Sequence, residues 1–218
     1  MSRFVLIPGA GGAAWYWHRV TPLLEDAVAV GLPADDPRAG LSKYVELVAQ
    51  AAGDGPVVLV AQSMGAFTAL PAVARLDVRH LVLLNAMVPA PGETAGDWWE
   101  NTGSQPARVA AARAGGYTEE VDLATYFLHD VPPEVAATGE DEQRPEADIA
   151  FEQPCDFERW PDVPTTILAG REDRFFPVEF QRRVARERVG SEITELPGGH
   201  LNALSQPRAV ADALLSCG

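Results

Sequence analysis

Residues 56–65 read Pro-Val-Val-Leu-Val-Ala-Gln-Ser-Met-Gly and predict a buried strand that ends in a sharp turn. The aliphatic residues 57–60 show no polar alternation, which is typical of a strand buried on both faces of a parallel sheet. A helix is expected to follow over residues 66–75. Ser63 would then lie at the apex of a strand-to-helix turn, an arrangement called a nucleophile elbow and usually written G-x-S-x-G. Ala61 replaces the first glycine of this motif and keeps the small side chain that so tight a turn requires.

The overall composition fits a single α/β domain and argues against several classes of partner. The 218 residues are 47% hydrophobic, which is enough to bury a large core. A formal net charge of −14 argues against nucleic acid and anionic membranes as partners. No segment approaches the roughly 20 apolar residues that span a bilayer. The first apolar run is also too short for a signal peptide.

Cys155 and Cys217 are the only cysteines of the chain. Their spacing fits neither a metal site nor a disulfide framework. We therefore expect two reduced thiols, no bound metal and a cytoplasmic location.

Strands and helices are predicted to alternate along most of the chain. Further buried strands are expected at residues 3–7, 27–30, 80–84, 164–170 and 191–196. Further helices are expected at residues 15–24, 41–52 and 207–215. Alternation at this spacing implies right-handed βαβ crossovers. The predicted α/β fold is therefore a mostly parallel central sheet flanked by helices.

The segment from residue 91 to 160 breaks this alternation, because it has no buried strand run. Short helices are expected at residues 105–114 and 119–129. An insertion of this kind would form a small cap that closes over an apolar substrate and excludes water. The domain organisation is then a core of residues 1–90 and 161–218 with a cap of residues 91–160.

Aromatic residues of this segment are candidates for the wall of a substrate pocket. They are Trp98, Trp99, Tyr126 and Phe127. The alternative is a helical surface excursion whose aromatic side chains only pack on the core.

A glycine-rich loop, Pro-Gly-Ala-Gly-Gly-Ala at residues 8–13, follows the first strand. Such a loop binds a dinucleotide when an acidic residue at the end of the second strand holds the ribose. Here Asp35 and Asp36 come only after a Gly-Leu-Pro break. We therefore favour a loop that donates a backbone N–H to an oxyanion, with no cofactor. The two donors would be Ala10 and Met64, with Gly11 beside the substrate.

Three residue types needed for nucleophilic catalysis each follow a predicted strand: Ser63, Asp173 and His200. The carboxyl ends of parallel strands meet at one edge of an open sheet, where ligands bind. A serine hydroxyl needs an imidazole to take its proton, and the imidazole needs a carboxylate to fix its tautomer. Taken singly, the serine fits a helix cap, the aspartate a turn and the histidine a loop. Their joint occurrence in the order nucleophile, acid, base predicts a catalytic triad.

Other residues are alternatives for the acid and the base. Glu172 is the closest alternative acid, because it adjoins Asp173. The other histidines are His18, His80 and His129. None is predicted to follow a strand end, since His80 precedes a strand and the other two lie in predicted helices.

The chain resembles α/β-hydrolases of the subgroup that contains plant methylesterases, hydroxynitrile lyases and small bacterial relatives. The segments that carry the resemblance are residues 5–12, 61–65, 85–92, 170–173 and 199–200. The resemblance implies the α/β-hydrolase fold with a small helical cap, a Ser-His-Asp mechanism and small esters as the usual substrates.

Two positions depart from the pattern of that subgroup. Pro8 stands where the relatives commonly carry a histidine in the first loop. Plant hydroxynitrile lyases carry a lysine directly after the catalytic histidine, whereas this chain has Leu201 there and Lys43 as its only lysine. Lyase activity is therefore disfavoured, and Leu201 is expected to form an apolar wall of the pocket.

The leading hypothesis from the sequence is hydrolysis of a small carboxylic ester through an acyl-enzyme intermediate. The alternatives are hydrolysis of a lactone or thioester, carbon–carbon bond chemistry on the same fold, and a non-catalytic receptor. Each of them places a small molecule in the site.

Overall fold

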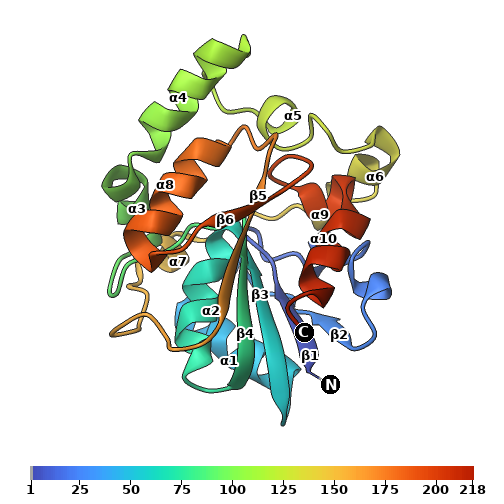
Figure 1. Cartoon of the computed structure of the whole chain (residues 1–218), viewed down its shortest axis with the longest axis vertical. Helices are drawn as coiled ribbons and strands as arrows, with labels where there is room; N and C mark the ends of the chain where they lie inside the picture. Colours follow the sequence, from blue (N-terminus) through green and yellow to red (C-terminus); the bar gives the residue numbers. More distant parts are fainter. Residues whose placement is uncertain (1) are drawn as a thin grey trace.

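The computed structural model describes residues 2–218, which form one sheet with helices on both faces (Figure 1). The strands lie in the order β2-β1-β3-β4-β5-β6, and every neighbouring pair is parallel. Their bounds are Arg3–Ile7 (β1), Ala27–Ala29 (β2), Pro56–Gln62 (β3), Asp77–Leu84 (β4), Thr165–Gly170 (β5) and Ile193–Leu196 (β6). The predicted parallel sheet flanked by helices is therefore confirmed.

The side chains of β3 alternate between two apolar cores, one on each face of the sheet. The elements that cover the two faces are α1 (Leu41–Ala52), α2 (Ala66–Val73), α8 (Val178–Val189), the 3₁₀ turn η1 (Ala14–Trp17), α9 (Asn202–Ser205) and α10 (Pro207–Leu215). Leu59 and Ala61 join the core under α1, α2 and α8. Val58 and Val60 join the core under η1, α9 and α10, on the opposite side in Figure 1. Burial on both faces explains the uninterrupted aliphatic run of this strand.

The segment between β4 and β5 is helical. Its elements are α3 (Ala95–Thr102), α4 (Ser104–Gly115), α5 (Leu123–Tyr126), α6 (Pro133–Ala137), the 3₁₀ turn η4 (Glu140–Glu142) and α7 (Asp148–Glu152). Figure 1 shows α4, α5 and α6 across the top of the molecule, beyond the sheet. Residues 91–160, all of them described, add no strand to the sheet. The segment is thus set apart from the sheet, while its role as a cap stays a prediction.

Two predicted helices are shorter than expected. Residues 15–24 form two 3₁₀ turns, η1 and η2 (Thr21–Leu23), because Pro22 lacks the N–H that a continuous helix needs there. Residues 119–129 contain only the four-residue helix α5. Its start is fixed by the Asp122 carboxylate, which accepts a hydrogen bond from the Thr125 N–H at 2.6 Å.

Strand β4 begins earlier than the apolar run predicts. It starts at Asp77 rather than His80, and its first four residues alternate between exposed and half-buried positions. This half-exposed end carries polar side chains, so apolar content alone missed it. His80 therefore lies within the strand and does not precede it.

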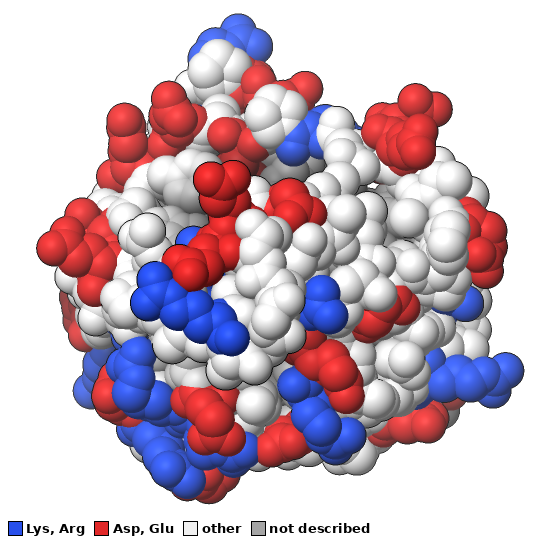
Figure 2. Space-filling model, turned by 90° about the horizontal axis from the view of Figure 1, so that it is seen from above, with Lys and Arg blue, Asp and Glu red and all other residues white. Residues whose placement is uncertain are grey.

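Charged groups of both signs are interspersed on the face seen in Figure 2. Several basic side chains of α8 pair with acids: Arg182 Nη2 lies 2.6 Å from Glu195 Oε1, and Arg186 Nε lies 2.7 Å from Glu192 Oε1. Ion pairs at or near the surface add little to stability.

No helix within residues 2–218 is long and apolar enough to cross a membrane. The same residues hold no group of three or more His, Cys, Asp or Glu side chains suited to a metal ion. Cys155 is buried, Cys217 is half-buried, and both are free thiols.

Candidate active site

Ser63 lies at the turn between β3 and α2, in a backbone conformation that is unfavourable for serine. Its φ is +50°, and it opens a 3₁₀ turn (Ser63–Gly65) that leads into α2. The turn is tight because the loop after β1 packs against it: a Cβ atom at Gly65 would lie 2.5 Å from the Pro8 carbonyl oxygen. A Cβ atom at Gly9 would lie 2.9 Å from the Ser63 Cβ. Glycine is therefore required at both positions.

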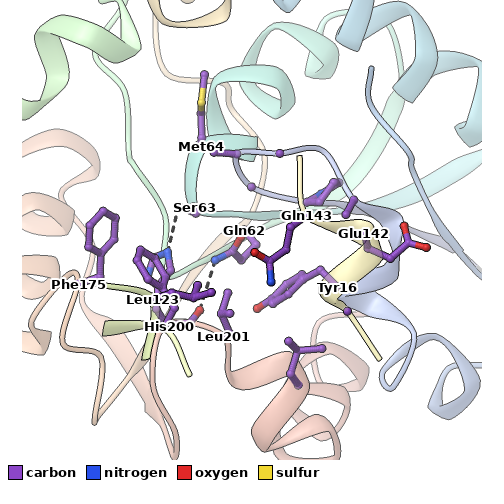
Figure 3. A pocket seen from close by; sticks show the side chains of 18 of the residues that line it. Tyr16, Gln62, Ser63, Met64, Leu123, Glu142, Gln143, Phe175, His200 and Leu201 are labelled. Atoms are coloured by element: carbon purple, nitrogen blue, oxygen red, sulfur yellow. Dashed lines mark hydrogen bonds between the residues drawn. The ribbon is translucent and has the colours of Figure 1, made fainter. Parts of the chain in front are cut away.

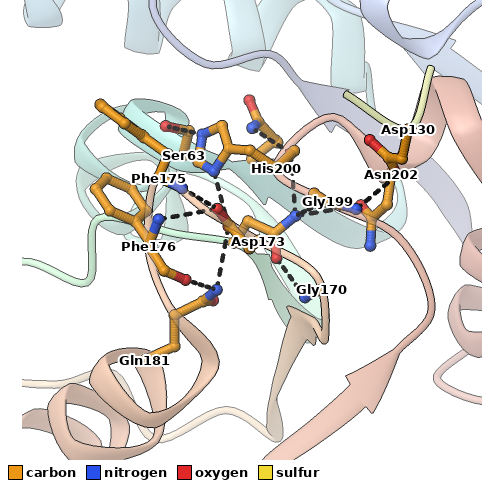
Figure 4. A network of polar contacts seen from close by, with 12 residues as sticks. Ser63, Asp130, Gly170, Asp173, Phe175, Phe176, Gln181, Gly199, His200 and Asn202 are labelled. Carbon is orange, nitrogen blue, oxygen red and sulfur yellow. Dashed lines mark hydrogen bonds and ion pairs between the residues drawn. The ribbon is translucent and has the colours of Figure 1, made fainter. Parts of the chain in front are cut away.

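The structure brings Ser63, His200 and Asp173 into one hydrogen-bonded chain (Figure 4). His200 Nε2 lies 3.1 Å from Ser63 Oγ, and His200 Nδ1 lies 2.9 Å from Asp173 Oδ2. The His200 side chain is only 3% exposed, so water cannot compete for these contacts. This arrangement has the geometry that serine nucleophiles need, since the imidazole can accept the hydroxyl proton while the carboxylate holds its other nitrogen.

The Asp173 carboxylate is fixed by hydrogen bonds from its own loop and from α8. Oδ1 accepts the N–H groups of Phe175 and Phe176, each at 2.8 Å. Oδ2 accepts Gln181 Nε2 at 3.2 Å as well as the histidine. These donors fix the orientation of the carboxylate beside His200.

The alternative acid and the alternative bases lie in other surroundings. Glu172 Oε2 accepts the Gly198 N–H at 2.5 Å. His18 Nδ1 lies 2.8 Å from the Trp15 carbonyl oxygen, and His80 Nε2 lies 2.8 Å from a threonine hydroxyl on β5. His129 Nε2 is buried and lies 4.0 Å from Asp130 Oδ1. Burial lowers the pKa of its imidazole.

Asn85 is a site residue that the sequence analysis missed. It follows β4 with a φ of +46°, and its side chain is fully buried. Its Nδ2 donates to the carbonyl oxygens of His200 at 3.0 Å and Gly199 at 3.3 Å, while its Oδ1 accepts the Gly170 N–H at 2.6 Å. Asn85 therefore ties the end of β5 to the histidine loop. The available signal was an asparagine directly after a buried strand, a residue type that tolerates positive φ.

Asp130 holds the same loop from the helical segment. Its Oδ2 accepts the Gly199 N–H at 2.7 Å and the Ser205 hydroxyl at 2.6 Å. Nothing in the sequence spacing pairs residue 130 with residue 199, so this contact had no sequence signal.

Aromatic rings surround the imidazole of His200. The ring centroids of Phe176, Phe175 and Phe127 lie 5.0, 5.2 and 5.5 Å from it, all edge-on. Phe127 was predicted to line the pocket, whereas Phe175 and Phe176 were not.

A cavity of about 450 Å³ opens beside Ser63 and His200 (Figure 3). Among the predicted pocket residues, Gly11, Trp99, Phe127 and Leu201 line it. Further lining side chains include Trp15, Tyr16, Met87, Leu123, Phe151, Phe175 and Leu204. The wall is thus mainly apolar and aromatic.

Trp98 and Tyr126 do not line this cavity, and their assignment to the pocket was wrong. Both are fully buried. The Trp98 indole packs against Phe176 and donates to the Val88 carbonyl oxygen at 3.0 Å. The Tyr126 hydroxyl donates to the Thr118 carbonyl oxygen at 2.5 Å. The polar atoms of both side chains donate to backbone oxygens, so both side chains point into the protein interior and away from the cavity.

The two predicted oxyanion donors, Ala10 and Met64, both line the cavity. Ala10 lies in a turn closed by a 3.1 Å hydrogen bond from the Gly12 N–H to the Gly9 carbonyl oxygen, and within residues 2–218 its own N–H has no acceptor. Met64 is the second residue of the 3₁₀ turn, where N–H groups lack partners within the helix. Both N–H groups are therefore available to a ligand.

Comparison with known proteins agrees with this fold. The model of the alpha/beta hydrolase family matches residues 4–213. The chain belongs to this family. Polyneuridine aldehyde esterase from Rauvolfia serpentina is 25% identical over 98% of the chain and 94% of its own length. The crystal structure of polyneuridine aldehyde esterase has a TM-score of 0.79, at 24% identity over 99% of this chain and 98% of that one.

Two further solved structures share the fold of this chain. A pyrethroid hydrolase from Sphingobium faniae has a TM-score of 0.75 at 22% identity, over 99% of this chain and 96% of that one. A methylesterase from Arabidopsis has a TM-score of 0.77 at 20% identity, over 99% of this chain and 98% of that one. The expected α/β-hydrolase family is thus confirmed, and the methylesterase shares its fold.

Replacing Asn85 is expected to destabilise the site measurably. Asn85→Gly keeps the positive φ but leaves buried N–H and carbonyl groups unpaired, so the free energy of unfolding should fall by about 2–3 kcal/mol. Asn85→Asp should be at least as costly at neutral pH, because it places a carboxylate against two carbonyl oxygens. Urea unfolding followed by tryptophan fluorescence measures both. Unchanged midpoints would show that Asn85 does not hold the histidine loop.

Proposed function

We propose that this α/β-hydrolase is an esterase that cleaves small carboxylic esters through an acyl-enzyme intermediate. The observation that carries the proposal is the hydrogen-bonded chain from Ser63 through His200 to Asp173, with its serine end facing an apolar cavity. The names of the similar proteins, polyneuridine aldehyde esterase, a methylesterase and a pyrethroid hydrolase, support ester chemistry.

The geometry supports a two-stage reaction. His200 Nε2 accepts the Ser63 proton as Oγ attacks the ester carbonyl, and the carbonyl becomes a tetrahedral oxyanion. The imidazolium then gives that proton to the leaving alcohol, and the acyl group stays on Ser63. Water attacks the acyl-enzyme by the same route, with His200 as base and then as acid, and releases the carboxylic acid. Asp173 stabilises the imidazolium throughout and keeps its charge.

The Ala10 and Met64 N–H groups are the proposed oxyanion donors. One such donor contributes roughly 3 kcal/mol to the transition state in comparable sites. The positive end of α2, which begins directly after the turn, adds to the field at Ser63.

The helical segment 91–160 is the proposed cap of this esterase. It contributes Leu123, Phe127 and Phe151 to the cavity wall, so it covers the side of the site that the sheet leaves open. A cytoplasmic location stays our prediction, since both cysteines are free thiols.

The cavity wall favours esters with an apolar group on each side of the carbonyl. Met87, Trp99 and Phe151 belong to or pack on the core under one face of the sheet. Trp15 and Leu204 belong to or pack on the core under the other face. Ser63 therefore lies between two apolar walls, and an ester bound there presents its acyl half to one and its alcohol half to the other.

Ser63→Ala is expected to abolish both ester turnover and covalent labelling by a fluorophosphonate, because within residues 2–218 no other hydroxyl is hydrogen-bonded to the His200 imidazole. Gel fluorescence and p-nitrophenyl ester assays measure the two effects.

Asp173→Asn should lower kcat by about four orders of magnitude, since the imidazole loses its tautomer control. Glu172→Gln is the matched control and should stay close to the parent. Labelling of Ser63→Ala at another serine would contradict the assignment.

Trp15 and Trp99, which both line the cavity, are expected to contact opposite halves of the ester, one the acyl group and the other the alcohol group. Trp99→Ala should change the ratio of kcat/KM for bulky over small groups about tenfold in one half of the ester. Trp15→Ala should change the same ratio in the other half. Steady-state kcat/KM values for matched pairs of esters, varied in the acyl or the alcohol group, measure both. If both variants alter selection of the same half, the two-wall arrangement is wrong.

A further inference from the structure

Glu146 links the helical segment to the turn that carries the proposed oxyanion donor. It lies between η4 and α7, and its Oε2 accepts the Gly11 N–H at 2.8 Å. Its Oε1 accepts the Tyr44 hydroxyl of α1 at 2.7 Å. The carboxylate thus joins three parts of the chain that are distant in sequence. Its neighbours Glu142 and Gln143 lie along the cavity in Figure 3.

The Gly11 N–H defines the conformation of this turn. The Gly9–Gly12 hydrogen bond closes a four-residue turn with a φ of +85° at Gly11, as in a type II turn. Type I and type II turns differ by rotation of the central peptide, here the one between Ala10 and Gly11. A carboxylate that accepts the Gly11 N–H holds this peptide in one orientation. The Ala10 N–H belongs to the preceding peptide, so the contact restrains where the Ala10 backbone lies and not which way the turn is flipped.

The position of Glu146 is itself fixed from two sides. Tyr44 is 2% exposed, and its side chain belongs to the core under α1. The next residue, Ala147, donates its N–H to the Ala34 carbonyl oxygen at 2.7 Å. The backbone around Arg144 also packs on the turn, since a Cβ atom at Gly11 would lie 2.8 Å from its carbonyl oxygen. Contacts on both sides of Glu146 therefore define where its carboxylate lies.

The charge of Glu146 does not explain its presence. A carboxylate close to an oxyanion opposes the developing negative charge, and burial raises the pKa of Glu146. Its useful property is the pair of hydrogen bonds that it accepts. An uncharged amide preserves that pair, because its oxygen accepts the Gly11 N–H and its NH₂ group donates to the Tyr44 oxygen.

We propose that Glu146 is a positioning residue for ester hydrolysis, which acts by holding the Gly9–Gly12 turn in the place where the Ala10 N–H can reach the oxyanion. This inference rests on the proposed function. It gives the helical segment a part in transition-state binding in addition to covering the cavity.

The test compares Glu146→Ala with Glu146→Gln in the full chain. Loss of the turn contact in Glu146→Ala should lower kcat by about 10- to 100-fold, less than the 10²–10³-fold cost of deleting an oxyanion donor. KM should change less than threefold. The inhibition constant of an aryl trifluoromethyl ketone, which forms a hemiketal oxyanion on the serine, should rise by the same factor as kcat falls. Glu146→Gln should stay within threefold of the parent in all three quantities.

Control variants separate this role from general destabilisation. Glu140→Ala, an exposed acid in η4, should leave the three quantities unchanged. Tyr44→Phe, which removes the other anchor of Glu146, should shift kcat and ketone inhibition in the same direction by a smaller factor. It also serves as the test variant if Glu146→Ala does not fold.

The inference is overturned if Glu146→Ala keeps the parent kcat. It is equally overturned if Glu146→Gln falls as far as Glu146→Ala, or if KM rises while ketone inhibition is unchanged. Fluorophosphonate labelling of Ser63 in Glu146→Ala distinguishes these results from failure of the proposed function. Retained labelling at Ser63 leaves the esterase assignment intact.

Discussion

The left-handed backbone at Ser63 is the constraint on which the rest of the site depends. Such a conformation costs a serine of order 1–3 kcal/mol and persists only where surrounding structure enforces it. Here the parallel pairing of Ile7 with Ala61 brings the ends of β1 and β3 together, and the loop after β1 then packs against the turn. The centre of the sheet therefore stabilises the strained serine. It also places the glycine-rich turn beside the serine hydroxyl.

The two loops that lie beside Ser63 are held in place by side chains from distant parts of the sequence. Asn85 and Asp130 bind the backbone of the histidine loop, and Glu146 binds that of the glycine-rich turn. Two of these three residues come from the helical segment between β4 and β5. That segment thus holds loops of the candidate site in addition to lining the cavity.

The sequence predicted the features that depend on local patterns. Buried strands appear as aliphatic runs, and the residue after each run falls at the same edge of the sheet, so Ser63, Asp173 and His200 were found together. Asn85, Asp130 and Glu146 were missed because the groups that they hold in these loops are backbone atoms, which leave no residue pattern. Trp98 and Tyr126 were misplaced because aromatic content predicts burial but not direction, and their polar atoms turn toward backbone oxygens. Trp15 and Tyr16 were not predicted to line the cavity, because residues 15–24 were predicted as one continuous helix, which Pro22 interrupts.

The central claim is that His200 activates Ser63 to carry the acyl group. A p-nitrophenyl dialkylcarbamate tests it most directly, because the carbamoyl group stays on the enzyme long enough for peptide mass spectrometry. The account predicts release of one p-nitrophenol per active site and a single carbamoyl adduct on the peptide that contains Ser63, with neither in His200→Ala. An adduct on a different residue, or full carbamoylation of Ser63 in His200→Ala, would contradict it.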